Sequence, residues 1–207
     1  MITVKVIDIS LPDPDAREIL RYMGCKELNG ELEALINKGI FECRGKVNSR
    51  VVFAEYGALE DSGRLDLTFA NTSSRDLGKA LTGCDRILLF GATVGIEIDR
   101  LILKYGKISP SLALCIQAIG AERIEAVCDA FCRQMAEKYA TEGYKLLPRF
   151  SPGYGDLPLS IQRDIFTALS CEKNIGLTLN DSLLMSPTKS VTAIAGIRKN
   201  KDFYEHT

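Results

Sequence analysis

The chain has 207 residues, of which 46% are hydrophobic and 26% charged, enough apolar material for the core of one domain. Its formal net charge of −1 excludes the strongly basic surface that binding to nucleic acid or to an anionic membrane requires. No apolar run approaches the roughly 20 residues that span a bilayer, and the opening MITVKVIDIS lacks the layout of a signal peptide. We therefore expect a cytoplasmic protein that binds neither nucleic acid nor membrane.

Two short helices are predicted near the N-terminus, after a strand. Alternating apolar residues predict the strand at residues 2–9. The first helix has Asp13 as its predicted N-cap, Pro14 at its first position and Gly24 as its stop. A second helix, NGELEALINKG, is predicted to end at Gly39.

The middle of the chain mixes strands with capped helices. A helix and a strand both fit RVVFAEYGALE, and a strand is predicted for RLDLTF. A buried strand is predicted for RILLFGAT because its apolar residues are continuous. SSRDLGKALTG predicts a helix with Ser73 or Ser74 as cap and Gly83 as stop, and GIEIDRLILKYG an amphipathic helix. A long helical region is then predicted from Ser109 to Glu142.

The C-terminal part predicts one more helix, LSIQRDIFTAL, and a terminal β-hairpin formed by SLLM and SVTAIAGI around SPTK. No internal repeat, low-complexity tract or linker divides the chain. A strict alternation of strand and helix fails at both ends of the sequence. We therefore predict an α+β fold in a single unit, with a mostly antiparallel sheet packed with long helices.

Cysteine and histidine usage narrows the chemistry. Seven cysteines, an odd number scattered through apolar segments, are typical of reduced thiols. Cys128 and Cys132 lie four apart in a helical pattern, but no CxxC pair or nearby histidine supports a metal there, so buried apolar side chains are the favoured interpretation. The one histidine, His206, lies in the polar tail KNKDFYEHT, which argues against a Ser-His-Asp or Cys-His site. We predict no metal site.

Two further features, the FGATVG segment and Glu125, each allow a purely structural and a functional interpretation. FGATVG follows a buried strand and precedes a helix, as a phosphate-binding loop does, but it matches neither GxGxxG nor GxxxxGK[ST]. A tight structural turn is therefore favoured there. Glu125 lies at the edge of the apolar stripe of the long helix, where a solvated position is the default and a pocket-facing one stays open.

A cation and an aromatic residue flank a stiff turn in RFSPGYGDLP. Pro152 fixes its own φ and restrains Ser151, while Gly153 allows the backbone to approach a ligand closely. Such a turn can present the guanidinium of Arg149, which suits a carboxylate, and the ring of Tyr154, which suits a cation. The alternative is an ordinary Pro-Gly turn with a surface arginine, and physical chemistry alone leaves both open.

The same stretch resembles the Arg-x-x-Pro-Gly-Tyr motif of the activation (S-adenosylmethionine-binding) domain of cobalamin-dependent methionine synthase. IGLTLNDSLLMSPTKSVTAIAGI is similar to the closing segment of that domain, and LLFGATVGIEIDRLI and SPSLALCIQAIGAERIEAVCDAF are similar to its middle section. The resemblance covers residues 65–197, so that residues 1–64 form a divergent N-terminal part and residues 198–207 a polar tail. It implies a stand-alone form of that domain.

The resemblance also implies a site. Arg149 would hold the carboxylate of S-adenosylmethionine, the backbone of Ser151 would reach its adenine, and Gly153 would form part of the rim. Tyr154 would lie beside the sulfonium and guide the transferred methyl group as the catalytic residue. Glu125, within one residue, would line the same pocket. Longer members contact the ligand's amino group through an Asp-Trp motif. This chain lacks that motif, so the amino-group contact has no assigned residue. After Tyr154, GDLPLS replaces the Pro-and-Cys-containing segment of the longer members.

The implied function is a reactivation subunit that acts on a separate cobalamin-dependent methionine synthase in methionine biosynthesis. The chain lacks the Asp-x-His-x-x-Gly motif of corrinoid modules, so cobalamin would be held by a partner protein. Flavodoxin or ferredoxin would supply the electron for reductive methylation of cob(II)alamin. Two alternatives stay open: service to another corrinoid methyltransferase, and a non-catalytic protein-binding module with the same fold.

Overall fold

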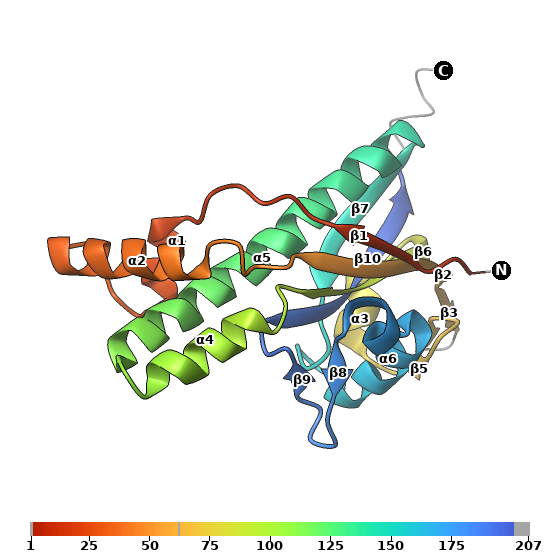
Figure 1. Cartoon of the computed structure of the whole chain (residues 1–207). Helices are drawn as coiled ribbons and strands as arrows, with labels where there is room; N and C mark the ends of the chain where they lie inside the picture. Colours follow the sequence, from red (N-terminus) through yellow and green to blue (C-terminus); the bar gives the residue numbers. More distant parts are fainter. Residues whose placement is uncertain (1, 62, 201–207) are drawn as a thin grey trace.

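A five-stranded antiparallel sheet is the centre of the computed structural model, which describes residues 2–61 and 63–200 (Figure 1). The prediction of an α+β fold with a mostly antiparallel sheet is confirmed, because every pairing within this sheet is antiparallel. In spatial order its strands are β1 (Lys5–Asp8), β2 (Arg50–Gly57), β6 (Cys84–Thr93), β10 (Ser190–Lys199) and β7 (Tyr144–Phe150). His206 lies outside the described residues.

Helices cover both faces of the sheet. One face carries α1 (Ala16–Tyr22), α2 (Gly30–Cys43), α4 (Glu97–Gly106) and the 32-residue α5 (Pro110–Thr141). The other face carries α3 (Arg75–Ala80), the 3-10 turn η1 (Leu159–Ile161), α6 (Gln162–Leu169) and α7 (Cys171–Ile175). Two small sheets complete the described elements: β3 (Leu59–Asp61) with β4 (Arg64–Asp66) and β5 (Asn71–Thr72), and β8 (Thr178–Leu179) with β9 (Met185–Ser186). None of the described helices combines the length and apolarity needed to cross a bilayer.

The strand β6 shows how one sheet supports two cores. Successive side chains of a strand point to opposite faces. Leu88 and Phe90 belong to the core under α5, whereas Ile87 and Leu89 belong to the core under α6. The ring of Phe90 packs 5.0 Å from that of Phe131 on α5. A strand with both faces buried reads as one continuous apolar run, which is how the sequence predicts it.

The predicted start of α1 is wrong by two residues. Asp15, not Asp13, is the N-cap, and its Oδ1 accepts the N–H of Arg17 at 2.8 Å. Asp13 is held in the preceding segment, where its carbonyl accepts a hydrogen bond from the buried guanidinium of Arg123 on α5 at 3.3 Å. The Asp13-Pro14 pair is therefore held by a long-range contact with Arg123 and does not start the helix.

The predicted end of α2 at Gly39 is also wrong, because the helix continues to Cys43. Gly39 serves close packing of α2 on α5. A Cβ at this position would lie 2.7 Å from Cδ1 of Ile119 and 2.9 Å from Sγ of Cys115. The glycine is therefore a packing residue rather than a helix stop.

The predicted terminal hairpin does not form. The short strand β9 pairs with β8, whereas β10 pairs with β6 on one side and β7 on the other. The ten residues of β10 are buried on both faces for most of their length, and only an interior position in the sheet satisfies such a strand. The neighbour β7 is not among the strands predicted from the sequence. It contains Pro148, which is tolerated because β7 is an edge strand.

Candidate functional site

A cavity of about 390 Å³ opens where β7 ends and β10 continues beyond it, and we call it the edge cavity. The pairing of β7 with β10 stops at Phe150 and Ile194, so the first part of β10 has β6 on one side and the cavity on the other. This volume is in the range of small-molecule sites. The lining residues are Glu125, Arg149, Phe150, Ser151, Pro152, Tyr154, Gln162, Met185, Ser190, Val191 and Thr192.

The backbone of β10 offers hydrogen-bonding groups to this cavity. Val94 N–H donates to the carbonyl of Lys189 at 3.1 Å, which marks that pair as one hydrogen-bonded rung of the β6–β10 ladder. Hydrogen-bonded and non-hydrogen-bonded rungs alternate in an antiparallel pair. The backbone N–H and C=O groups of Ser190 and Thr192 therefore point away from β6, toward the edge cavity.

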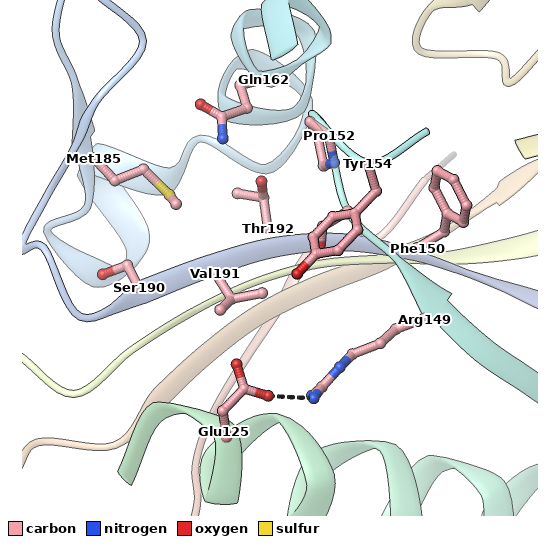
Figure 2. A pocket seen from close by; sticks show the side chains of 11 residues that line it. Glu125, Arg149, Phe150, Pro152, Tyr154, Gln162, Met185, Ser190, Val191 and Thr192 are labelled. Carbon is pink, nitrogen blue, oxygen red and sulfur yellow. Dashed lines mark hydrogen bonds and ion pairs between the residues drawn. The ribbon is translucent and has the colours of Figure 1, made fainter. Parts of the chain in front are cut away.

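The edge cavity reaches both faces of the sheet. Arg149 is opposite Ala195, whose side chain lies in the core under α5, so Arg149 points to that face. Thr192 lies two residues before Ile194, whose side chain lies in the core under α6, so Thr192 points to the opposite face. Figure 2 shows Arg149 on one side of β10 with Glu125 of α5, and Thr192 on the other side with Gln162 of α6. A ligand in this cavity meets two chemically different ends.

Charged side chains form the end beneath α5. Nη2 of Arg149 lies 2.6 Å from Oε2 of Glu125 and 3.2 Å from Oδ1 of Asp129, and the Arg149 side chain is 25% exposed. Burial acts to lower the pKa of Arg149, but Cys128, Glu125 and Asp129 together outweigh it, and the pKa is raised. The guanidinium therefore stays charged, with Nη2 paired to carboxylates and Nη1 without a hydrogen-bond partner. Asp129, which sequence reasoning missed, stands one helical turn after Glu125.

The cysteines beside this charged end are not arranged for metal binding. Burial raises the pKa of the Cys128 thiol to about 12 and also raises that of Cys132, so both are protonated near neutral pH. Across residues 2–61 and 63–200 there is no group of three or more His, Cys, Asp or Glu side chains that could hold a metal ion.

A tight turn after β7 carries Tyr154 to the mouth of the cavity. Tyr154 N–H donates to the carbonyl of Ser151 at 3.2 Å, and Gly153 N–H donates to that of Leu157 at 3.0 Å. Gly153 has a φ of 87°, in the left-handed region that favours glycine. The turn leaves Tyr154 70% exposed, and Figure 2 shows its ring among the side chains that line the cavity.

Asp156 anchors this turn to α3. Its carboxylate accepts hydrogen bonds from the Ser74 hydroxyl, from Arg75 N–H at 2.8 Å and from Asp76 N–H at 3.2 Å. These bonds, that of Ser74 first, lower the pKa of Asp156. Sequence reasoning had no signal for this contact, because about 80 residues separate its two sides.

Buried polar atoms without a partner gather around the edge cavity. Three such side-chain atoms occur in the described part of the chain: Nη1 of Arg149, Oε1 of Gln162 and Oγ1 of Thr192. All three residues line the edge cavity. Buried polar atoms in folded proteins nearly always have a hydrogen-bond partner, either a protein group or an ordered water, so these three atoms are available to water or to a polar ligand.

Comparison with known proteins finds similarity of structure but not of sequence. No family model matches the chain, and no curated protein matches its sequence. The solved structure of the MetH reactivation domain bound to AdoHcy superposes with a TM-score of 0.69 at 17% sequence identity, covering 98% of this chain and 80% of that one. The fold is that of the MetH reactivation domain.

Within this reactivation-domain fold, four of the five residues expected from the sequence line one cavity. Glu125, Arg149, Ser151 and Tyr154 are brought together, whereas Gly153 is outside the lining and its N–H is occupied within the turn. Gly153 thus shapes the turn that carries Tyr154. Sequence reasoning missed three lining residues that carry polar side chains on the α6 face or on β10: Gln162, Ser190 and Thr192.

Proposed function

We propose that this chain binds S-adenosylmethionine in the edge cavity. The observation that carries the proposal is the convergence of three unpartnered, buried polar atoms on one cavity of suitable size. The reactivation domain that shares the fold was solved with AdoHcy, the demethylated form of this ligand. The local motif around Arg149 and Tyr154 gives independent support, since it was singled out from the sequence without the fold.

The charges of the cavity complement the amino-acid end of the ligand. The free Nη1 of Arg149 suits the ligand carboxylate, and its guanidinium geometry favours such planar recognition. The ligand ammonium is bonded to the same carbon as that carboxylate and must therefore lie near Arg149. Glu125 is the lining carboxylate at that point, 2.6 Å from Nη2. We assign the amino-group contact to Glu125, with Asp129 reinforcing the negative charge.

Tyr154 stands where the sulfonium would be presented to a partner. Its ring can face a cation through its π-electrons, and its 70% exposure places it at the mouth rather than the floor of the cavity. The residues of the chain thus bind and orient the methyl donor and leave its methyl group accessible from outside. Methyl transfer needs no general base, in keeping with a lining that has no histidine. It needs an approach geometry that these contacts fix.

The biochemical role that follows is reactivation of a cobalamin-dependent methionine synthase. The ligand supplies a methyl group whose bond to sulfur breaks as it passes to the reduced cobalt of a partner's cobalamin module, leaving S-adenosylhomocysteine. An electron donor such as flavodoxin or ferredoxin reduces the cob(II)alamin beforehand. In this proposal the chain is catalytic only in complex with the corrinoid protein.

The test is a reconstitution. A cobalamin module loaded with cob(II)alamin is mixed with reductant and S-adenosylmethionine, with and without the chain, and methylcobalamin is followed by its absorbance. We expect methylcobalamin to form only when the chain is present. No product with the modules of methionine synthase or of any other corrinoid methyltransferase would remove the reactivation role, while binding of the ligand could still stand.

A further inference from the structure

We propose that Gln162 and Thr192 recognise the adenine amino edge of the ligand and so set the nucleobase specificity of the edge cavity. This proposal rests on the proposed function, since it concerns the same ligand. It concerns the end of the cavity opposite Arg149, where sequence reasoning placed only the backbone of Ser151.

Both side chains are buried, and both present an unpartnered polar atom. Gln162 is 5% exposed and Thr192 2% exposed, and neither Oε1 of Gln162 nor Oγ1 of Thr192 has a hydrogen-bond partner among the described residues. Figure 2 shows the Gln162 carboxamide projecting from α6 toward Thr192 on β10. Neither atom adds a hydrogen bond between protein groups to the stability of the fold, so both remain available to a ligand.

The surroundings of the pair suit a neutral, flat heterocycle. The nearby lining on this side includes the apolar side chains of Phe150, Pro152 and Met185, and no charged residue lines the cavity beyond Glu125 and Arg149. Since the carboxylate and ammonium of the ligand are drawn to those charged residues, its uncharged adenosyl end must occupy the other end.

Carboxamide chemistry then selects adenine. A glutamine can pair with an adenine in bidentate fashion, accepting from the N6 amino group and donating to N7. Oε1 of Gln162 supplies the acceptor, and the hydroxyl of Thr192 supplies a second polar contact. A base that carries a 6-oxo group in place of the amino group offers no donor at that position, so the site discriminates against it.

The experiment compares S-adenosylhomocysteine with S-inosylhomocysteine by calorimetric titration of the wild type, Gln162→Leu and Thr192→Val. The two ligands differ at C6 and in the hydrogen that N1 of the 6-oxo base carries. Gln117→Leu, a change of an exposed glutamine on α5, is the matched control. We expect the wild type and the control to prefer the adenosyl ligand about tenfold, the scale of one hydrogen bond lost with an unpaired buried group. In Gln162→Leu this preference should fall to within about threefold, and Thr192→Val should bind the adenosyl ligand about three- to tenfold more weakly.

Thermal unfolding of the unliganded variants separates a ligand-binding role from a structural one. Replacement of an unpartnered polar atom by an apolar group of similar shape should leave the unfolding midpoint unchanged or raise it. A lowered midpoint in both variants would mean that the two side chains support the fold, and it would overturn the inference. Should Gln162→Leu fail to fold, the ligand preference of the wild type and the affinity of Thr192→Val decide whether the inference holds.

The titrations also separate this inference from the proposed function. If the wild type binds both ligands equally, or if Gln162→Leu keeps the full preference, the inference is wrong and ligand binding stands. If the wild type binds neither ligand, both fail together.

Discussion

Replacement of Tyr154 tests the role of its ring. The side chain is 70% exposed, so its removal exposes little new apolar surface and should barely change the stability of the protein. A cation over an aromatic face contributes about 0.5–2 kcal/mol, so Tyr154→Ala should weaken the binding of S-adenosylmethionine about 2- to 30-fold. Tyr154→Phe keeps the face of the ring and should bind nearly as the wild type does.

The matched ligand is S-adenosylhomocysteine, which lacks the transferred methyl group and the positive charge on sulfur. Calorimetric titration of both ligands into wild type, Tyr154→Phe and Tyr154→Ala therefore isolates the interaction of the ring with the charge. We expect the alanine variant to lose more affinity for the charged ligand than for the neutral one. Equal losses for both ligands, or a phenylalanine variant as weak as the alanine variant, would refute this role of Tyr154.

Two further predictions concern stability. The folded-state pKa of Asp156 is lowered, so its stabilisation is fully present above the unfolded value of about 3.9 and is lost as the pH falls through the folded value. The gap in urea midpoint between wild type and Asp156→Asn should therefore be larger at pH 7 than at pH 3, and a constant gap would contradict this. Gly39→Ala gains about 1 kcal/mol in helix propensity, but its Cβ would lie 2.7 Å from Cδ1 of the buried Ile119, an overlap that costs about 1–3 kcal/mol. We expect a net loss of about 1 kcal/mol by chemical denaturation, and a more stable variant would show that α2 and α5 separate freely.

The fold class can be predicted from the sequence because strands and helices have local sequence signals. The pairing of strands depends on residues far apart in the chain, so it was predicted less well. The order of elements was enough to favour an antiparallel sheet. The partner of β10 was mispredicted because the short segment SPTK satisfies the local rule for a hairpin. Both faces of β10 are apolar, so an interior position between β6 and β7 buries more apolar surface than a terminal hairpin would.

The residues of the candidate site also fall into those with a local sequence signal and those without one. Arg149 and Tyr154 stand out because they flank one stiff turn in the sequence, and the resemblance of that turn to the motif of the activation domain assigns their roles. Gln162 and Thr192 escaped because each has an ordinary local setting, at a helix start and within a strand. Only the packing of α6 beside β10 brings them together and buries them without partners.

Arg149 provides the most direct test of the central claim that S-adenosylmethionine binds in the edge cavity. The measurement is the dissociation constant of this ligand for wild type, Arg149→Ala and Arg133→Ala, the last a change of an exposed arginine on α5 as the control. A hydrogen bond to a charged group contributes about 1.5–3 kcal/mol, so Arg149→Ala should weaken binding about 10- to 150-fold while Arg133→Ala binds as the wild type does. Equal affinities in all three proteins, or no binding to the wild type, would contradict the account.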